Sequence, residues 1–171
     1  GGPHVHFEIR NKQGTVALNP FLFYSNISDK SQPRIYSITV FPLDSLSFVN
    51  GAEKKQVFAA RQISPGVYRI SEKIRVKGRV GVGIRANDYM HNVHHVFGVY
   101  SVRFDCNGER LYERKLDSIS FYETNDINSL LDYEAFLLRK QYTEKLYVEP
   151  NNSLSIYSVT NNGLMVESHD G

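Results

Sequence analysis

His4 and His6 are the residues of this chain whose types and spacing best suit chemistry. Val5, Phe7 and Ile9 occupy the alternate positions, and this period of two predicts a β-strand with both imidazoles on one face. Two imidazoles on one rigid strand can share a task, because one can ligate a metal ion while the other handles a proton beside it. The alternative is an edge strand with two exposed histidines that have no such role.

The sequence around these histidines, GPHVHFEIR at 2–10, resembles the last signature of the lysostaphin-like (LytM-type) zinc endopeptidases. Those enzymes cut peptide cross-bridges in bacterial cell walls. After a glycine-containing turn at 11–14, the sequence LNPFL at 18–22 resembles the segment with which the family leaves this motif. By position, the resemblance implies that His6 ligates Zn²⁺ and that His4 is the catalytic histidine beside the metal-bound water.

The resemblance also implies ligands that this motif does not contain. In the family, a further His and an Asp come from an upstream His-x(n)-Asp segment, and another catalytic His lies upstream as well. Catalytic zinc keeps three protein ligands and one open position for water, and the motif supplies one of the three. We therefore expect the other ligands upstream of residue 1. The 171 residues are then the C-terminal portion of a longer polypeptide and are inactive as a peptidase alone.

A second group of histidines, His91, His94 and His95, follows Asp88. Predicted strands on both sides place the group in a loop, where His91 and His95 could ligate a metal together with Asp88. The simpler interpretation is a solvated loop, because His94 and His95 point in different directions in any regular structure. Cys106 is the sole cysteine and precedes an Asn-Gly turn, so we interpret it as a structural residue at the end of a strand.

The composition is that of a folded protein and disfavours several classes of function. Hydrophobic residues make up 41% of the chain and charged residues 22%, as in ordinary globular domains. A formal charge of +2 with scattered lysines and arginines predicts no nucleic-acid partner. No apolar run is long enough to span a bilayer. Export to the periplasm or cell surface follows from the family resemblance alone.

Short strands separated by turn signals dominate the rest of the chain. We interpret 1–30 as the C-terminal fragment of a zinc-peptidase-like β domain that ends in a polar linker at 25–33. The region 31–171 has strand candidates at 34–41, 56–60, 66–70, 79–86, 98–105, 109–114, 145–148 and 153–157. This spacing predicts a mainly β fold in which an immunoglobulin-like β-sandwich follows the peptidase fragment. The chain ends on a turn, which predicts truncation at the C-terminus as well.

One inserted helix is expected near 128–141, after capping residues at 126–129. Leu130, Leu137 and Leu138 share one side of it, whereas Phe136 lies elsewhere. A helix that is apolar on more than one side must pack against something large. A sandwich face, the peptidase domain and a protein partner are the alternatives.

Parts of the downstream region, GVYSV at 98–102, INSLLDY at 127–133 and NSLSIY at 152–157, resemble the accessory region of some cell-wall peptidases of the Bacteroidetes type. These segments are less specific than the histidine motif, and no catalytic role comes with them.

Two functions of different classes therefore remain open. The first is a zinc endopeptidase acting on peptidoglycan peptides, in which the metal lowers the pKa of a bound water and polarises the scissile carbonyl. The second is a non-catalytic β-sandwich that binds cell wall or a protein partner, with the histidine strand as a relic. Eleven tyrosines and ten phenylalanines suit either sugar-binding platforms or a sandwich core. We favour the first for the parent protein.

Overall fold

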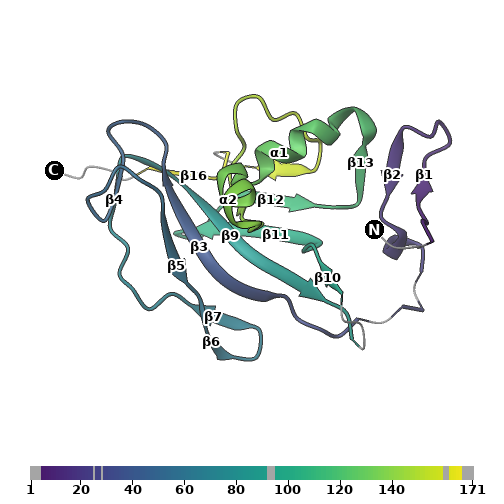
Figure 1. Ribbon diagram of the computed structural model, residues 1–171, viewed down its shortest axis with the longest axis horizontal. Coiled ribbons are helices and arrows are strands. Elements are labelled where there is room, and N and C mark those ends of the chain that lie inside the picture. The colour runs from purple at the N-terminus through teal and green to yellow at the C-terminus, as the bar shows by residue number, and fades with distance from the viewer. Residues whose placement is uncertain (1–4, 25, 28, 92–94, 160–161, 167–171) are drawn as a thin grey trace.

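The computed structural model describes residues 5–24, 26–27, 29–91, 95–159 and 162–166. Within these residues the protein is built mainly of antiparallel β-sheets, with two short α-helices and two 3-10 helices (Figure 1). The predicted mainly β fold class is therefore confirmed. None of the helices in these ranges is long and apolar enough to cross a membrane.

The largest sheet is organised around one long strand, β9 (Arg79–Tyr89). On one side, β9 pairs antiparallel with β3 (Arg34–Pro42), which in turn pairs with β5 (Gln56–Ala59). On its other side lie three short strands, β10 (Val96–Phe97), β14 (Glu144–Lys145) and β16 (Leu164–Val166). One strand thus positions segments from nearly the whole length of the chain.

Gly81 and Gly83 allow close packing over β9. A Cβ atom at Gly81 would lie 2.4 Å from the ring of Tyr147, and one at Gly83 would lie 2.9 Å from the ring of Phe41. The two rings meet edge to face with their centroids 6.0 Å apart. Glycines inside a strand allow a close approach of this kind.

A second sheet contains β11 (Ser101–Cys106), β12 (Glu109–Lys115) and β15 (Tyr157–Val159). It packs on the central sheet through a buried apolar cluster of Val82, Val102, Tyr112 and Leu146. The two sheets form a layered arrangement of the kind that burial of one face of each sheet produces. The finer prediction of an immunoglobulin-like topology stays a prediction.

β11 and β12 form the hairpin predicted across the Asn-Gly turn. Asn107 and Gly108 both have positive φ, at 52° and 84°, as the favoured two-residue hairpin turns require. Cys106 is the last residue of β11, as expected.

Smaller sheets complete the fold. β4 (Phe48–Val49) pairs with β8 (Val76–Lys77) over a second buried cluster of Val40, Val49, Phe58 and Val80. β6 (Arg61–Ser64) and β7 (Val67–Arg69) form a hairpin that projects from one end of the central sheet (Figure 1). The strands predicted at 145–148 and 153–157 are shorter or displaced, since β14 covers two residues and β15 begins at Tyr157.

The single helix expected near 128–141 is instead two short helices, α1 (Ile127–Leu130) and α2 (Tyr133–Arg139). Leu131 between them is extended and forms a β-bridge with Glu144. The Asp132 carboxylate then accepts a hydrogen bond from the backbone N–H of Ala135, at 3.2 Å, and so caps α2. An Asp side chain competes for backbone N–H groups in this way, which favours a helix start over a helix interior.

The expected apolar stripe is only partly buried. Leu130 is buried, but the side chains of Leu137 and Leu138 are 52% and 73% exposed. Ala135 is the buried residue of α2. The break at Asp132 changes the rotational relation between the two halves, so residues from α1 and α2 no longer share one face.

The N-terminal residues share a sheet with the downstream region. β1 (Ile9–Arg10) pairs with β2 (Val16–Leu18), and β2 pairs with β13 (Ser118–Ser120). One 3-10 helix, Pro20–Leu22, follows β2, and another, Phe121–Asp126, follows β13. This small sheet stands at one end of the molecule (Figure 1). The predicted peptidase fragment is thus joined to region 31–171 by backbone pairing.

Candidate functional site

The histidine motif lies next to the outer strand of the N-terminal sheet. The strand expected from the alternating pattern is present only at Ile9–Arg10, and residues 5–8 are in no strand. β2 is three residues long and reaches no further along β1, so it offers 5–8 no pairing partner. Val5 is 95% exposed and Phe7 61% exposed, so most of the apolar side of the motif is open to solvent, although the ring of Phe7 contacts that of Tyr24.

His6, the predicted zinc ligand, presents its imidazole to solvent, with 75% of the side chain exposed. His4, the predicted catalytic histidine, lies outside the described residues. Nε2 of His6 is 3.9 Å from Oε1 of Glu8, which makes an ion pair when the imidazole is protonated. One predicted site residue is therefore placed on an accessible surface beside a carboxylate.

Glu8 forms an ion pair with Arg10, two residues further along the chain. The guanidinium of Arg10 donates a hydrogen bond to Oε1 of Glu8 and holds the pKa of this carboxyl below its usual range. Arg10 in turn lies over the ring of Phe121, with Cζ 4.7 Å from the ring centroid. A carboxylate beside a histidine can accept the N–H of the ring nitrogen that does not bind metal. Glu8 could therefore orient His6, a role that its sequence pattern did not reveal.

The donor groups near His6 fit zinc in kind, since imidazole and carboxylate are both zinc ligands. They are too few for a complete site. Within the part of the chain that the structure describes, no group of three or more His, Cys, Asp or Glu side chains could hold a metal ion.

The second histidine group lies between β9 and β10, which form a hairpin with Val96 opposite Tyr89. His91 is in a turn and His95 precedes β10, and both are exposed. His94 lies outside the described residues. A backbone hydrogen bond from Ser31, followed by smaller contributions that include His91, lowers the pKa of Asp29. His91 therefore lies near the acidic Asp29.

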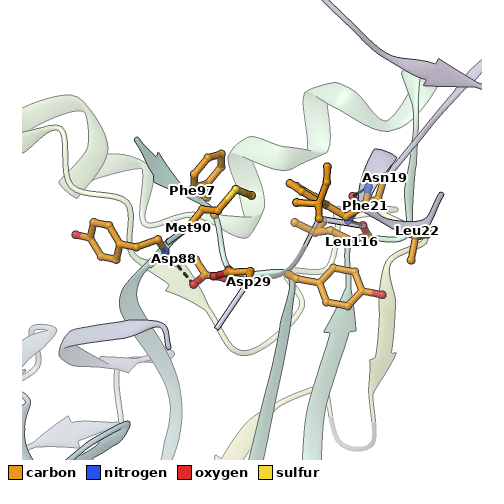
Figure 2. A pocket seen from close by; sticks show the side chains of 12 residues that line it. Asn19, Phe21, Leu22, Asp29, Asp88, Met90, Phe97 and Leu116 are labelled. Carbon is orange, nitrogen blue, oxygen red and sulfur yellow. Dashed lines mark hydrogen bonds between the residues drawn. The ribbon is translucent and has the colours of Figure 1, made fainter. Parts of the chain in front are cut away.

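A cavity of about 500 Å³ opens between the N-terminal segment and the β9–β10 hairpin (Figure 2). Phe21 and Leu22 of the 3-10 helix at 20–22 form one wall, and Met90 and Phe97 of the hairpin form another. Asp29 and Asp88 are its acidic residues. Sequence reasoning missed this cavity because its walls come from segments far apart in the chain that show no common motif.

A second cavity, of about 510 Å³, lies between the β9–β10 hairpin, the end of α1 and the second sheet. Arg114 and Glu144 contribute its charged groups, and their side chains are only 3% and 14% exposed. Nε of Arg114 donates to Oε1 of Glu144 at 2.7 Å, and Nη1 donates to the carbonyl oxygens of Val99 and Tyr100. Because these groups satisfy one another, the pair is best explained as part of the core.

Comparisons with known proteins give no family assignment: no family model matches the chain, and no curated protein or solved structure matches it significantly.

Proposed function

We propose that this chain is the C-terminal portion of a zinc endopeptidase of the lysostaphin-like type, exported to the periplasm or cell surface. Its substrate would be the peptide bonds of bacterial peptidoglycan. The observation that carries the proposal is the sequence GPHVHFEIR at 2–10 followed by LNPFL at 18–22. The exposed imidazole of His6, next to the carboxylate of Glu8, is compatible with a metal ligand at this position.

Asn19 and Pro20 both have a role in the local structure, which supports the resemblance of 18–22 to the segment that follows the motif in the family. Oδ1 of Asn19 accepts a hydrogen bond from the backbone N–H of Phe21, and Pro20 begins the short helix, where its missing N–H costs nothing. Nδ2 of Asn19 donates to the carbonyl oxygen of Leu116 at 3.0 Å. Asn19 thus turns the chain after β2 and attaches it to the downstream region.

In the proposed site, His6 would hold the metal through one ring nitrogen. Glu8 would accept the N–H of the other nitrogen and so fix the direction of the ring. His4 would exchange a proton with the reacting groups, as histidine can near neutral pH. Bound zinc supplies a Lewis acid that lowers the pKa of a water molecule. The remaining ligands would come from residues outside this chain.

The proposal is tested on the native polypeptide that contains these 171 residues. Mass-spectrometric sequencing upstream of Gly1 should find a His, an Asp a few residues later, and a further His. Hydrolysis of purified peptidoglycan should be lost with a chelator and in His6→Ala, but not in His95→Ala, which removes an exposed imidazole elsewhere. Absence of the upstream residues, or full activity of His6→Ala, would overturn the peptidase proposal.

A second candidate is a non-catalytic module, with an immunoglobulin-like sandwich, that binds cell wall or a protein partner. The observation in its favour is a set of tilted aromatic rings in contact at α2 and just after it: Tyr133 and Phe136 have centroids 6.1 Å apart, and Phe136 and Tyr142 have centroids 5.0 Å apart. Tyr133 and Tyr142 are 45% and 58% exposed. Co-sedimentation with purified peptidoglycan should weaken in Tyr142→Ala and not in Tyr122→Ala, a control at another exposed tyrosine.

A further inference from the structure

The cavity between the N-terminal segment and the β9–β10 hairpin combines an apolar body with two carboxylates. Phe21, Leu22 and Phe97 line it and keep 49%, 54% and 36% of their surface exposed. Figure 2 shows Met90 and Phe97 on one side and Phe21, Leu22 and Leu116 on the other, with Asp29 and Asp88 near Met90. Apolar walls with a few placed polar groups are typical of ligand pockets.

The phenol groups of the cavity already have partners. The hydroxyl of Tyr100 donates to Oδ1 of Asp117, and the hydroxyls of Tyr89 and Tyr36 are 2.6 Å apart. The polar chemistry left to a ligand therefore centres on the two cavity carboxylates.

Each cavity carboxylate is oriented by the backbone. Oδ1 of Asp29 accepts the N–H of Ser31 and Oδ1 of Asp88 accepts the N–H of Tyr89, both at 2.9 Å. The Ser31 side chain and the backbone N–H of His91 make further hydrogen bonds to Asp29. An ionised carboxylate has about four acceptor sites, so both aspartates keep capacity for another donor. The hydrogen bond from Ser31 lowers the pKa of Asp29 and favours its charged form. His91, which lies near Asp29, and Arg34, which stacks on Tyr89, are the neighbouring basic residues.

We propose that this cavity binds an aliphatic ammonium group, as in the lysine side chain of a peptide. The methylene chain would lie against Phe21, Met90 and Phe97, and the ammonium would donate hydrogen bonds to Asp29 and Asp88. Three donors on one ammonium nitrogen can reach acceptors that come from two different segments. Aromatic faces near the cation add a favourable electrostatic contact. The proposal is independent of zinc and of peptidase activity, because it uses neither His4 nor His6.

The first test uses two probes that differ only in the terminal ammonium group, with the whole 171-residue chain. N-acetyl-lysine methylamide and N-acetyl-norleucine methylamide are titrated while backbone amide shifts are followed by NMR. The lysine probe should shift the amides of Asp88, Met90 and Phe97, and the norleucine probe should bind at least about tenfold more weakly, as loss of a charge-assisted hydrogen bond predicts. Equal affinities, shifts confined to other regions, or no binding at about 10 mM would overturn the proposal.

The second test changes the carboxylates. Asp88→Asn and Asp29→Asn should each weaken the lysine probe by about tenfold and leave the weaker norleucine binding unchanged. Glu53→Gln removes the same charge from an exposed residue outside the cavity and should not alter either affinity. Unchanged lysine binding in both aspartate variants would overturn the assignment of the carboxylates. If one variant fails to fold, the other variant and the comparison of the two probes on the unaltered chain still test the proposal.

Discussion

At the scale of single residues, Arg114 and Glu144 form an ion pair whose two side chains are largely removed from solvent. Arg114 is 3% exposed, and its guanidinium is shared between Glu144 and the carbonyl oxygens of Val99 and Tyr100. Oε1 of Glu144 also accepts the hydroxyl of Tyr112, at 3.1 Å. The pair thus ties β12 to β14 and to the segment before β11.

Arg114→Met should reduce the free energy of unfolding by about 3–5 kcal/mol, because it leaves the carboxylate of Glu144 buried without a counter-charge. Arg103→Met is the control, since the ion pair of Arg103 with Asp105 is exposed and should be worth less than about 1 kcal/mol. Urea unfolding of both variants measures the difference. A loss in Arg114→Met no larger than that in the control would show that the pair does not support the core.

The buried Tyr112 and Tyr147 and the half-buried Tyr157 predict that the protein loses stability in alkali. Burial raises the pKa of Tyr157 to about 12, and burial raises the pKa values of Tyr112 and Tyr147 even further. Tyrosines of the unfolded chain titrate near 10, so the folded state binds more protons above that pH. The stabilisation is complete below pH 10 and falls as the pH rises from 10 towards 12 and beyond.

The free energy of unfolding, measured in urea at several pH values, should therefore decline above pH 10. Tyr157→Phe should make this decline shallower, because it removes one of the groups whose titration is linked to unfolding. Tyr122→Phe is the matched change at a ring that is 85% exposed and should keep the slope of the unaltered protein. A slope insensitive to Tyr157→Phe contradicts the explanation.

At the scale of elements, the Asn107-Gly108 turn fixes the register of the β11–β12 hairpin. Gly108→Ala should destabilise the protein by about 1 kcal/mol, because φ of 84° is unfavourable for a residue with a Cβ although no atom stands within 4 Å. Gly98→Ala is the control, since that position is equally open and has no positive φ. Thermal unfolding compares the two. Equal stabilities would mean that the backbone conformation of the turn is not the cause.

Elements set by local chemistry are those that the sequence predicts well. β3 and the β11–β12 hairpin follow from alternation and turn residues, and the strand prediction 34–41 differs from β3 by one residue. β14 has two residues, and its pairing depends on β9, which lies about sixty positions away in the chain. The continuous helix was wrong because Asp132 binds a backbone N–H within the apolar run. Apolar periodicity predicts a helix but does not indicate whether a polar residue inside the run caps a new one.

The candidate sites divide in the same way. The motif at 2–10 is contiguous, so it could be identified from sequence, whereas its strand is shortened because pairing ends at Ile9. The carboxylate of Glu8 and the cavity with Asp29 and Asp88 depend on how separate segments meet in space. Periodicity in the sequence does not predict such contacts between separate segments.

At the scale of the whole molecule, Asn19 links the N-terminal segment to the remainder. The backbone N–H of Asn19 donates to the carbonyl oxygen of Asp117. Likewise, the backbone N–H of Phe121 donates to the carbonyl oxygen of Thr15. Asn19→Ala removes the side-chain bonds to Phe21 and Leu116, at a cost of about 1 kcal/mol for the cap. The amides of Asn19 and Phe121 should then exchange hydrogen faster, while those of the central sheet keep their rates.

Asn26→Ala, an exposed change seven residues away, should leave exchange of the N-terminal sheet unaltered. If Asn19→Ala behaves like this control, backbone pairing alone holds the two regions together. If it accelerates exchange throughout the molecule, the N-terminal segment and the central sheet unfold as one cooperative unit.

The 171-residue chain alone should show no chelator-sensitive hydrolysis of purified peptidoglycan. The reason is ligand number: a catalytic zinc ion needs three protein ligands, and the resemblance assigns only His6 of this chain to that role. The assay compares this chain with the native polypeptide at equal concentration, with and without added Zn²⁺. Activity restored by the longer polypeptide and abolished by His6→Ala fits a site assembled from both parts. Robust zinc-dependent cleavage by the chain alone would require a different ligand set and overturn this assignment.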